Sequence, residues 1–299
     1  MITILGATAG GKTSVAANLA YSINGEVISA DSRQVYRGMD IGTGKDIADY
    51  TVNGTEIPYH LIDIVDAGYK YSVFEYQKDF LKAYNDIKKR GKFPVLCGGT
   101  GMYIEAVVNG YELVPVPPNP DLRTELGQKS DEELINLLVS LRTLHNRTDI
   151  DSKKRLIRAI EIELYIKEHK IETPEYPVIR NIYFGINYDR EIRRQRITQR
   201  LKQRLAEGMV EEVEKLMAKG ISADDLIFYG LEYKYLTLYI TGQLTYDEMF
   251  SQLNVAIHQF AKRQMTWFRG MERQGAVINW IDGLLPMEKK IESILSFLK

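Results

Sequence analysis

A short stretch near the N-terminus has the composition of a phosphate-binding loop. The pattern G-x-x-x-x-G-K-T, between an apolar run and an amphipathic segment, is matched by the consecutive residues Gly6, Ala7, Thr8, Ala9, Gly10, Gly11, Lys12 and Thr13. Glycines let backbone N–H groups converge on phosphate oxygens, while the lysine adds a positive charge and the threonine hydroxyl can bind Mg²⁺. The pattern therefore predicts a polyphosphate site. The alternative is a glycine-rich turn with an incidental lysine.

The loop by itself leaves the ligand open. ATP or GTP would be the default choice, with phosphoryl transfer to water or to a small acceptor. A diphosphate ester fits equally well, because the same loop would stabilise the charge that develops on a departing diphosphate as a carbon–oxygen bond breaks. Other motifs are needed to distinguish a nucleotide-binding enzyme that uses ATP from a transferase whose substrate is a diphosphate ester.

The elements around this loop indicate an α/β fold. Short β-branched runs at 2–5 and 26–30 alternate with an amphipathic stretch at 12–23, which is typical of a parallel sheet with crossover helices. A third apolar run at 61–65, a helix at 73–89 and a strand at 93–97 continue the pattern. We therefore expect a P-loop NTPase-like parallel sheet flanked by helices.

The pattern changes after the first third of the chain. The proline-rich stretch 114–120 predicts a linker, because proline lacks the N–H donor and restricts its predecessor. Periodicity then predicts helices at 131–144, with Ser130 as cap, and at 152–168, until 173–177 interrupts the run. Strand character returns at 182–188 and 277–280, with a basic helix at 190–207 and further helices up to Phe268 between them. We expect a core domain at 1–112 and 181–299 with a helical insertion domain at 113–180.

Composition restricts the class of protein. With 299 residues and a net charge of −1, the chain can bury a full core but has no global positive field, so a nucleic acid would need a local basic patch. The single cysteine, Cys97, excludes an intramolecular disulfide, and we interpret it as a core residue. No apolar run is long enough for a membrane span, and the first strand begins at Ile2, so we expect a cytoplasmic protein without a membrane partner, acting as a monomer.

Several further motifs follow the loop in a fixed order. They are Asp31-Ser32-Arg33-Gln34-Val35-Tyr36, Asp40-Ile41-Gly42-Thr43-Gly44-Lys45, Pro58-Tyr59-His60-Leu61-Ile62-Asp63, Gly98-Gly99-Thr100-Gly101-Met102-Tyr103 and Ala261-Lys262-Arg263-Gln264-Met265-Thr266-Trp267-Phe268-Arg269. Over nearly the whole chain this series resembles the bacterial tRNA dimethylallyltransferases. The resemblance implies transfer of a dimethylallyl group from dimethylallyl diphosphate to N6 of adenosine 37 in the anticodon stem-loop of tRNA, with Mg²⁺ as cofactor.

The resemblance also implies roles for particular residues. The exocyclic amine of adenine is a poor nucleophile, so a carboxylate that takes its proton is expected, and Asp31 follows a strand where such sheets place their ligands. A magnesium ligand or a turn cap is the alternative for Asp31. Thr100 would contact the reacting phosphate or the adenosine, unless it serves only its turn. Arg200 matches an arginine that contacts the diphosphate, although an exposed helix face explains it almost as well.

RNA contacts are assigned by the same resemblance. The set comprises Arg123, Lys154, Arg155 and Arg158 in the insertion, Lys262 and Arg263 near the end, and Asp31, Ser32, Arg33, Gln34 and Thr100 around a flipped adenosine. At helical spacing Arg193, Arg196, Arg200 and Arg204 form a stripe. Charge alone would favour a solvated face for such runs.

Aromatic residues and one irregular motif complete the set of predictions. Tyr36 and Tyr103 either stack on bases or belong to the core, and Trp267 is assigned to the core. The segment Tyr229-Gly230-Leu231-Glu232-Tyr233-Lys234 departs from the Gly-Tyr-Lys sequence usual in the family. RNA contacts at this segment are therefore not predicted.

Three other functions share parts of this pattern. A P-loop kinase of a nucleoside or small metabolite would use the same loop, sheet and strand-end aspartate. A prenyltransferase acting on free adenine nucleotides would lack a use for the insertion and its arginines. A nucleotide-dependent RNA-binding switch would carry out no transfer.

Overall fold

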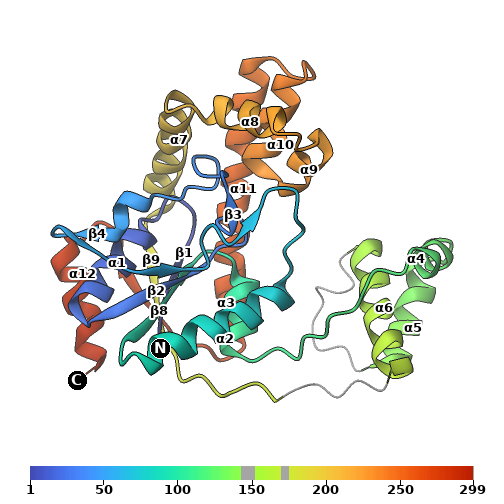
Figure 1. Cartoon of the computed structure of the whole chain (residues 1–299), viewed down its shortest axis with the longest axis horizontal. Helices are drawn as coiled ribbons and strands as arrows, with labels where there is room; N and C mark the ends of the chain where they lie inside the picture. Colours follow the sequence, from blue (N-terminus) through green and yellow to red (C-terminus); the bar gives the residue numbers. More distant parts are fainter. Residues whose placement is uncertain (143–151, 170–174, 299) are drawn as a thin grey trace. The chain divides into compact units, whose positions relative to one another are not determined.

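The computed structural model describes residues 1–142, 152–169 and 175–298. Two compact units make up the chain, one of Met1–Gly110 with Val178–Lys299 and the other of Tyr111–Pro177, so the second unit interrupts the first in sequence (Figure 1). The insertion predicted from the sequence was 113–180. No helix in these described ranges is long and apolar enough to cross a membrane.

A six-stranded parallel sheet forms the centre of the first unit. Its strands lie in the order β10 (Ile278–Asp282), β9 (Ile182–Asn187), β1 (Ile2–Gly6), β8 (Phe93–Gly98), β2 (Gly25–Ala30) and β6 (Tyr59–His60). Strand β1 is central and fully buried, which explains why its sequence is mostly apolar. The carboxyl ends of β1, β2 and β8 meet at one edge, where the predicted motifs begin.

The apolar run at 61–65 does not add a strand to the central sheet. The chain pairs with β2 only at β6, and it then turns because Leu61 and Asp63 adopt left-handed φ angles of 62° and 56°. Extended structure returns at β7 (Val65–Asp66), which pairs with β3 (Tyr36–Arg37) in a separate two-stranded sheet. Apolar content alone did not distinguish a strand from this buried turn.

Helices cover both faces of the sheet (Figure 1). Helix α1 (Lys12–Ser22) packs on β1, β2 and β8, and α12 (Met287–Leu295) packs beside it on the same apolar cluster. Helices α2 (Val73–Lys89) and α3 (Gly101–Val108) pack together and against β8. The capping box of Ser72 and Glu75 fixes the start of α2.

A group of helices after β9 extends the first unit. It contains α7 (Arg190–Ala206), α8 (Met209–Ala218), α9 (Ala223–Tyr229), α10 (Leu231–Ile240) and α11 (Tyr246–Arg273). Gly208 and Gly230, with φ of 98° and 75°, end one helix and begin the next. Helix α11 contacts β1, α3, α7 and α10. The late part of the chain is thereby placed beside the phosphate-binding loop.

Short elements complete the first unit. They are η1 (Ile47–Tyr50), the hairpin β4 (Thr51–Val52) and β5 (Thr55–Glu56), and η3 (Ser296–Leu298).

The second unit is helical and has its own small core. Helices α4 (Pro120–Gly127), α5 (Asp131–Leu141) and α6 (Lys153–His169) bury an apolar cluster that includes Leu126, Leu134 and Leu156. The predicted cap at Ser130 is confirmed, because its side chain accepts from the Glu133 N–H in a capping box.

Two of the predicted boundaries in this unit need correction, and a third lies partly outside the described residues. The linker ends before Pro120, which begins α4, because proline is tolerated at the first helical position. Helix α5 ends at Leu141 rather than 144, and residues 143–144 lie outside the described ranges. The predicted break at 173–177 lies partly outside them, and the described residues from 175 have no regular secondary structure.

Candidate active site

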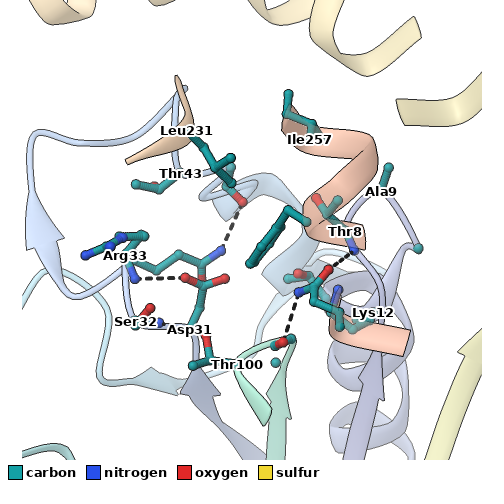
Figure 2. Close-up of a pocket in the computed structure, with 18 of the residues that line it drawn as sticks. Thr8, Ala9, Lys12, Asp31, Ser32, Arg33, Thr43, Thr100, Leu231 and Ile257 are labelled. Atoms are coloured by element: carbon teal, nitrogen blue, oxygen red, sulfur yellow. Dashed lines mark hydrogen bonds between the residues drawn. The ribbon is translucent and has the colours of Figure 1, made fainter. Parts of the chain in front are cut away.

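A cavity of about 820 Å³ lies where β1, β2 and β8 end. Its walls come from the phosphate-binding loop, the residues after β2, the turn after β8, one face of α7, the start of α10 and part of α11. Figure 2 shows Thr8, Ala9 and Lys12 on one side of the pocket and Asp31, Ser32, Arg33 and Thr100 on the other. Segments from both ends of the first unit thus share one site.

The phosphate-binding loop has backbone features that require its glycines. Gly11 adopts φ 68° at the start of α1, and a Cβ at Gly6 would lie 2.7 Å from the Ile186 carbonyl oxygen. Lys12 Nζ donates to the Ala7 carbonyl at 2.9 Å, and burial lowers the pKa of Lys12. Residues from Thr8 to Thr13 line the cavity, whereas Gly6 and Ala7 are not among its lining residues.

The opposite wall holds a set of fixed polar groups. Asp31 Oδ1 accepts from the Arg33 N–H at 2.9 Å, and the Ser32 N–H donates to Thr100 Oγ1 at 3.2 Å. Gln34 accepts from Ser29 Oγ at 3.0 Å and donates to the Gly44 carbonyl at 3.1 Å, which fixes its amide orientation. The structure therefore brings Asp31, Ser32, Arg33, Gln34 and Thr100 together, as predicted from their motifs.

One side chain of α11 joins two turns of the site. Gln264 accepts from the Thr8 N–H at 2.8 Å and donates to the Gly99 carbonyl at 2.9 Å. Both distances belong to well-formed hydrogen bonds, and the side chain is buried. Sequence reasoning did not single out this residue, although a glutamine on the buried face of an amphipathic helix is a detectable signal.

The arginines of α7 contribute positive charge. Arg196, Arg200 and Arg204 line the cavity, as helical spacing predicts for residues four apart. Arg196 Nε donates to the Ala9 carbonyl at 3.1 Å, while Arg193 instead contacts Asn187. The sequence predicted a diphosphate contact for Arg200 only. The structure shows that Arg196 and Arg204, on the same face of α7, line the cavity as well.

Acidic side chains partly balance these cations. Asp46 pairs with Arg200 and, at 3.5 Å, with Arg204. Burial lowers the pKa of Arg204 and raises the pKa of Glu232, which also lines the cavity. A polyanionic ligand would compete with Asp46 for these guanidinium groups.

The prediction that Trp267 belongs to the core is wrong. The indole lines the cavity, donates from Nε1 to Glu105 Oε2 at 2.5 Å and packs against Gly101, where a Cβ would lie 2.2 Å from its ring. A partly buried indole N–H needs an acceptor, and the Glu105 carboxylate supplies it. Burial raises the pKa of Glu105. Periodicity did not separate a half-buried pocket wall from the core.

Burial decides the alternative left open for Tyr36 and Tyr103, and it also tests the interpretation of Cys97 as a core residue. Tyr103 is 5% exposed and stacks on Tyr76 with ring centroids 4.0 Å apart, and Tyr36 is 1% exposed, so both belong to the core. Cys97 is buried, which confirms it as a core residue, and this burial raises the pKa of its thiol to about 12.

The irregular segment Tyr229–Lys234 proves to be part of the site. Gly230 breaks the helix, and Leu231 follows with a left-handed φ of 36°, which is strained for a branched side chain. Leu231, Glu232 and Tyr233 all line the cavity. The departure from the usual motif thus falls on a wall of the pocket.

The basic residues assigned to RNA have different surroundings. In the second unit Arg123 and Arg158 both pair with the buried Glu161, at 2.7 and 2.5 Å, while Lys154 and Arg155 are exposed. On α11 Arg263 lines the cavity and Lys262 is exposed on the surface. Two of the predicted RNA contacts therefore also hold their own unit together.

The residues of the loop fit a magnesium ion bound mainly through a ligand. Within the described ranges, no cluster of three or more His, Cys, Asp or Glu side chains could hold a metal. Thr13, the second residue of α1, lines the cavity. Mg²⁺ commonly takes one or two protein oxygens and completes its shell with phosphates and water, so this donor set suits it.

The fold and the site define a P-loop protein in which the phosphate-binding loop faces a strand-end carboxylate across one cavity. A sequence profile described as IPP transferase matches residues 34–271, and the chain belongs to this family. It is 63% identical over 299 residues to tRNA dimethylallyltransferase 2 of Bacteroides fragilis, covering 100% of this chain and 98% of that protein.

Solved structures agree with this assignment. The tRNA isopentenylpyrophosphate transferase of Bacillus halodurans is 34% identical with a TM-score of 0.73, covering 99% of this chain and 94% of that one. A eukaryotic dimethylallyltransferase solved acting on tRNA is 22% identical with a TM-score of 0.75, covering 95% and 73%, and shows the shared fold.

Proposed function

We propose that this chain is a tRNA dimethylallyltransferase, which transfers a dimethylallyl group from dimethylallyl diphosphate to N6 of adenosine 37 in tRNA. The observation that carries the proposal is the single cavity in which the phosphate-binding loop faces Asp31 and Thr100 (Figure 2). Its volume of about 820 Å³ suits a diphosphate ester together with a nucleobase. Family membership supports the same reaction.

The reaction assigns a proton to Asp31. The N6 lone pair forms a bond to C1 of the dimethylallyl group as the C1–O bond breaks, and diphosphate leaves with that bonding pair. The proton lost by N6 passes to the Asp31 carboxylate, which is held by the Arg33 N–H at 2.9 Å. The Thr100 hydroxyl, tied to the Ser32 N–H, stands beside the same wall.

The other wall stabilises the departing diphosphate. Lys12, Arg196 and Arg200 line this part of the cavity, and their positive charges would offset the negative charge that grows on the leaving oxygen. Mg²⁺, when bound near Thr13, would neutralise a further part of the diphosphate charge. Burial lowers the pKa of Lys12, and a bound diphosphate would favour its charged form again.

RNA contacts are proposed at three places. Arg263 and Lys262 on α11 would meet the RNA close to the cavity, and Lys154 and Arg155 would do so from the second unit, where both are exposed. The adenine would be flipped between Asp31, Gln34 and Thr100.

We also predict a cytoplasmic monomer, and light scattering of the purified chain would check its oligomeric state.

A comparison of donors tests the proposal. The chain is incubated with an anticodon stem-loop and either ¹⁴C-labelled dimethylallyl diphosphate or ATP, in the presence of Mg²⁺. Label in the RNA is the expected result, and release of ADP that depends on an acceptor, without prenyl transfer, would identify a kinase instead.

Two acceptors serve as controls. A stem-loop with inosine at position 37 lacks the amine and is expected to remain unlabelled. AMP offered in place of RNA separates transfer to tRNA from prenylation of free nucleotides, because the latter activity would label AMP at a comparable rate.

A further inference from the structure

A carboxylate far from the sequence motifs is bonded to the loop after β3. Glu212, near the start of α8, is buried and accepts from the backbone N–H groups of Asp40, Ile41 and Gly42 at 2.8, 2.6 and 3.0 Å. Three successive N–H groups around one carboxylate form an anion-binding nest, here filled by a side chain. Such charge-assisted bonds are stronger than neutral ones, so they fix the position of this loop.

The same carboxylate holds a second segment. Tyr233 donates its hydroxyl proton to Glu212 Oε1 at 2.7 Å, and its ring packs on Gly42, where a Cβ would lie 2.8 Å from the ring. Tyr233 lies in the segment whose residues Leu231 and Glu232 line the cavity. Glu212 therefore joins the loop to the start of α10.

The loop held by Glu212 reaches both sides of the cavity. The Gly44 carbonyl accepts from Gln34 on the side of Asp31, and Asp46 pairs with Arg200 and Arg204 on the side of the diphosphate. A shift of the loop would move groups on both walls.

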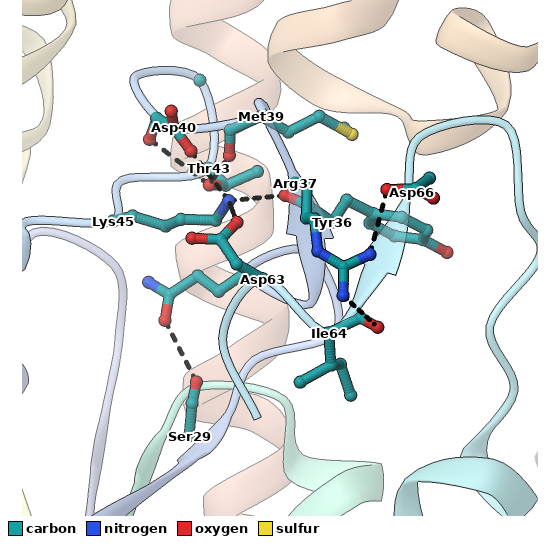
Figure 3. Close-up of polar contacts among 12 residues, drawn as sticks. Ser29, Tyr36, Arg37, Met39, Asp40, Thr43, Lys45, Asp63, Ile64 and Asp66 are labelled. Atoms are coloured by element: carbon teal, nitrogen blue, oxygen red, sulfur yellow. Dashed lines mark hydrogen bonds and ion pairs between the residues drawn. The ribbon is translucent and has the colours of Figure 1, made fainter. Parts of the chain in front are cut away.

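A separate ion cluster closes the other side of the loop. Lys45 Nζ donates to the Tyr36 carbonyl at 2.5 Å and to Asp40 Oδ1 at 2.8 Å, and it also pairs with Asp63 (Figure 3). These contacts do not involve Glu212. Loss of the Glu212 carboxylate would therefore displace the loop without releasing it.

We infer that Glu212 is a positioning residue for the transfer reaction, which sets the distance between the adenine side and the diphosphate side of the cavity. The inference rests on the proposed function for its kinetic meaning. Its structural basis is the set of four hydrogen bonds that Glu212 accepts from two pocket walls.

The variant Glu212→Gln tests this inference. Glutamine has nearly the same shape as glutamate, but its amide nitrogen cannot accept a hydrogen bond. Because both oxygens of Glu212 accept bonds, the amide nitrogen would face donors that it cannot pair with, and the loop would move. We expect kcat to fall about 100-fold, the loss typical of misplacing reacting groups by about 1 Å. The KM for dimethylallyl diphosphate and the Kd for inorganic diphosphate should rise about tenfold, the size of one charged hydrogen bond. The Kd for the stem-loop should not change.

The diphosphate constants separate positioning from instability. A partly unfolded sample loses kcat in proportion but keeps its KM, so a normal KM together with a normal diphosphate Kd would overturn the inference. Titration with inorganic diphosphate needs no transfer chemistry, so it tests whether Glu212 positions the diphosphate side of the cavity independently of the reaction. A wild-type chain that transfers nothing would contradict the proposed function, whereas an unchanged diphosphate Kd in Glu212→Gln would contradict the positioning role.

Two further variants complete the experiment. Glu211→Gln changes the exposed neighbouring carboxylate on α8 and is expected to match the wild type. If Glu212→Gln does not fold, Tyr233→Phe carries the test, because it removes only the 2.7 Å bond. It should raise the KM for dimethylallyl diphosphate about threefold, as one net hydrogen bond would, and an unchanged KM would again overturn the inference.

Discussion

At the scale of single residues, the acceptor side of the cavity depends on Asp31. The position of Asp31 after β2 follows from the sequence. Its orientation depends on the Arg33 N–H, which donates a hydrogen bond to Asp31 Oδ1. Thr100 is tied to the same turn by the Ser32 N–H. The carboxylate therefore faces the cavity from a short side chain on a turn whose backbone is fixed by hydrogen bonds.

Replacing Asp31 with asparagine should stop transfer while leaving binding intact. The amide keeps the contact with the Arg33 N–H but cannot take the N6 proton, so we expect the single-turnover rate to fall about 10²–10⁴-fold. The stem-loop Kd, measured by fluorescence anisotropy, should stay within about twofold. Asp66→Asn, at an exposed aspartate, is the matched control, and an unchanged rate in Asp31→Asn would remove Asp31 from the role of base.

At the scale of elements, α11 connects the phosphate-binding loop to the turn after β8. Gln264 makes one hydrogen bond to each, and Trp267, one turn further along the helix, forms part of the cavity wall. Helix α11 thus couples the ends of β1 and β8 through side chains. The sheet by itself fixes only their backbones.

Gln264→Ala should weaken this connection. It removes the side chain that bonds the Thr8 N–H and the Gly99 carbonyl. We expect a roughly 10–100-fold loss of transfer rate, because the phosphate-binding loop is no longer fixed relative to the turn after β8. Gln259→Ala, at an exposed position on the same helix, should have the wild-type rate. Equal rates for the two variants would argue against a positioning role for α11.

The helical insertion contains an ion cluster that responds to pH. Burial of Glu161 opposes its ionisation, but bonds from Arg123, the Asn119 N–H and Arg158 outweigh burial and lower its pKa from 4.5 to about 2. Because the folded pKa lies below the unfolded one, the cluster stabilises the unit fully above pH 4.5 and is lost as pH falls from 4.5 towards 2.

Glu161→Gln should therefore lower the free energy of unfolding at neutral pH. It should also reduce the loss of stability that occurs as the pH falls below 4.5. We expect a loss on the order of 2 kcal/mol, because bonds to a charged group are removed. Urea unfolding of the full chain at pH 7 and at pH 3, followed by a probe in α6, measures both effects. The cluster would not have the assigned role if the variant and the wild type lost stability equally on acidification.

At the scale of the whole molecule, a chain with net charge −1 has to bind RNA through local surfaces. The cavity carries Arg263 at its edge and an arginine-lined wall on α7, and the second unit exposes Lys154 and Arg155. Each surface can neutralise a few phosphates. Such binding depends on salt even where the net charge is close to zero.

RNA affinity should fall steeply with salt. If roughly four phosphates are neutralised, the stem-loop Kd should weaken by a factor of about 50 to 150 between about 50 and 200 mM KCl. The double variant Lys154→Gln, Arg155→Gln should have a shallower slope because two cations are removed. Lys289→Gln, at an exposed lysine of α12, is the control and should keep the wild-type slope. A flat response in the wild type would refute the proposed basic contacts.

The sequence by itself determined the phosphate-binding loop, the α/β class and the family. These features are local: the loop is contiguous, helix and strand periods are read within a few turns, and Asp31 and Thr100 follow directly after their strands. The stripe of arginines on α7 was also readable, because residues four apart share a helix face.

Only the tertiary structure decided which residues complete the site. Gln264 meets Thr8, and Glu212 meets Gly42, across separations of 256 and 170 residues, which no local period encodes. Trp267 became a pocket wall because Gly101 leaves room for it, and the run at 61–65 became a turn because only two residues of that region pair with β2. Packing and long-range hydrogen bonds made these choices, since they depend on segments that meet only when the chain folds.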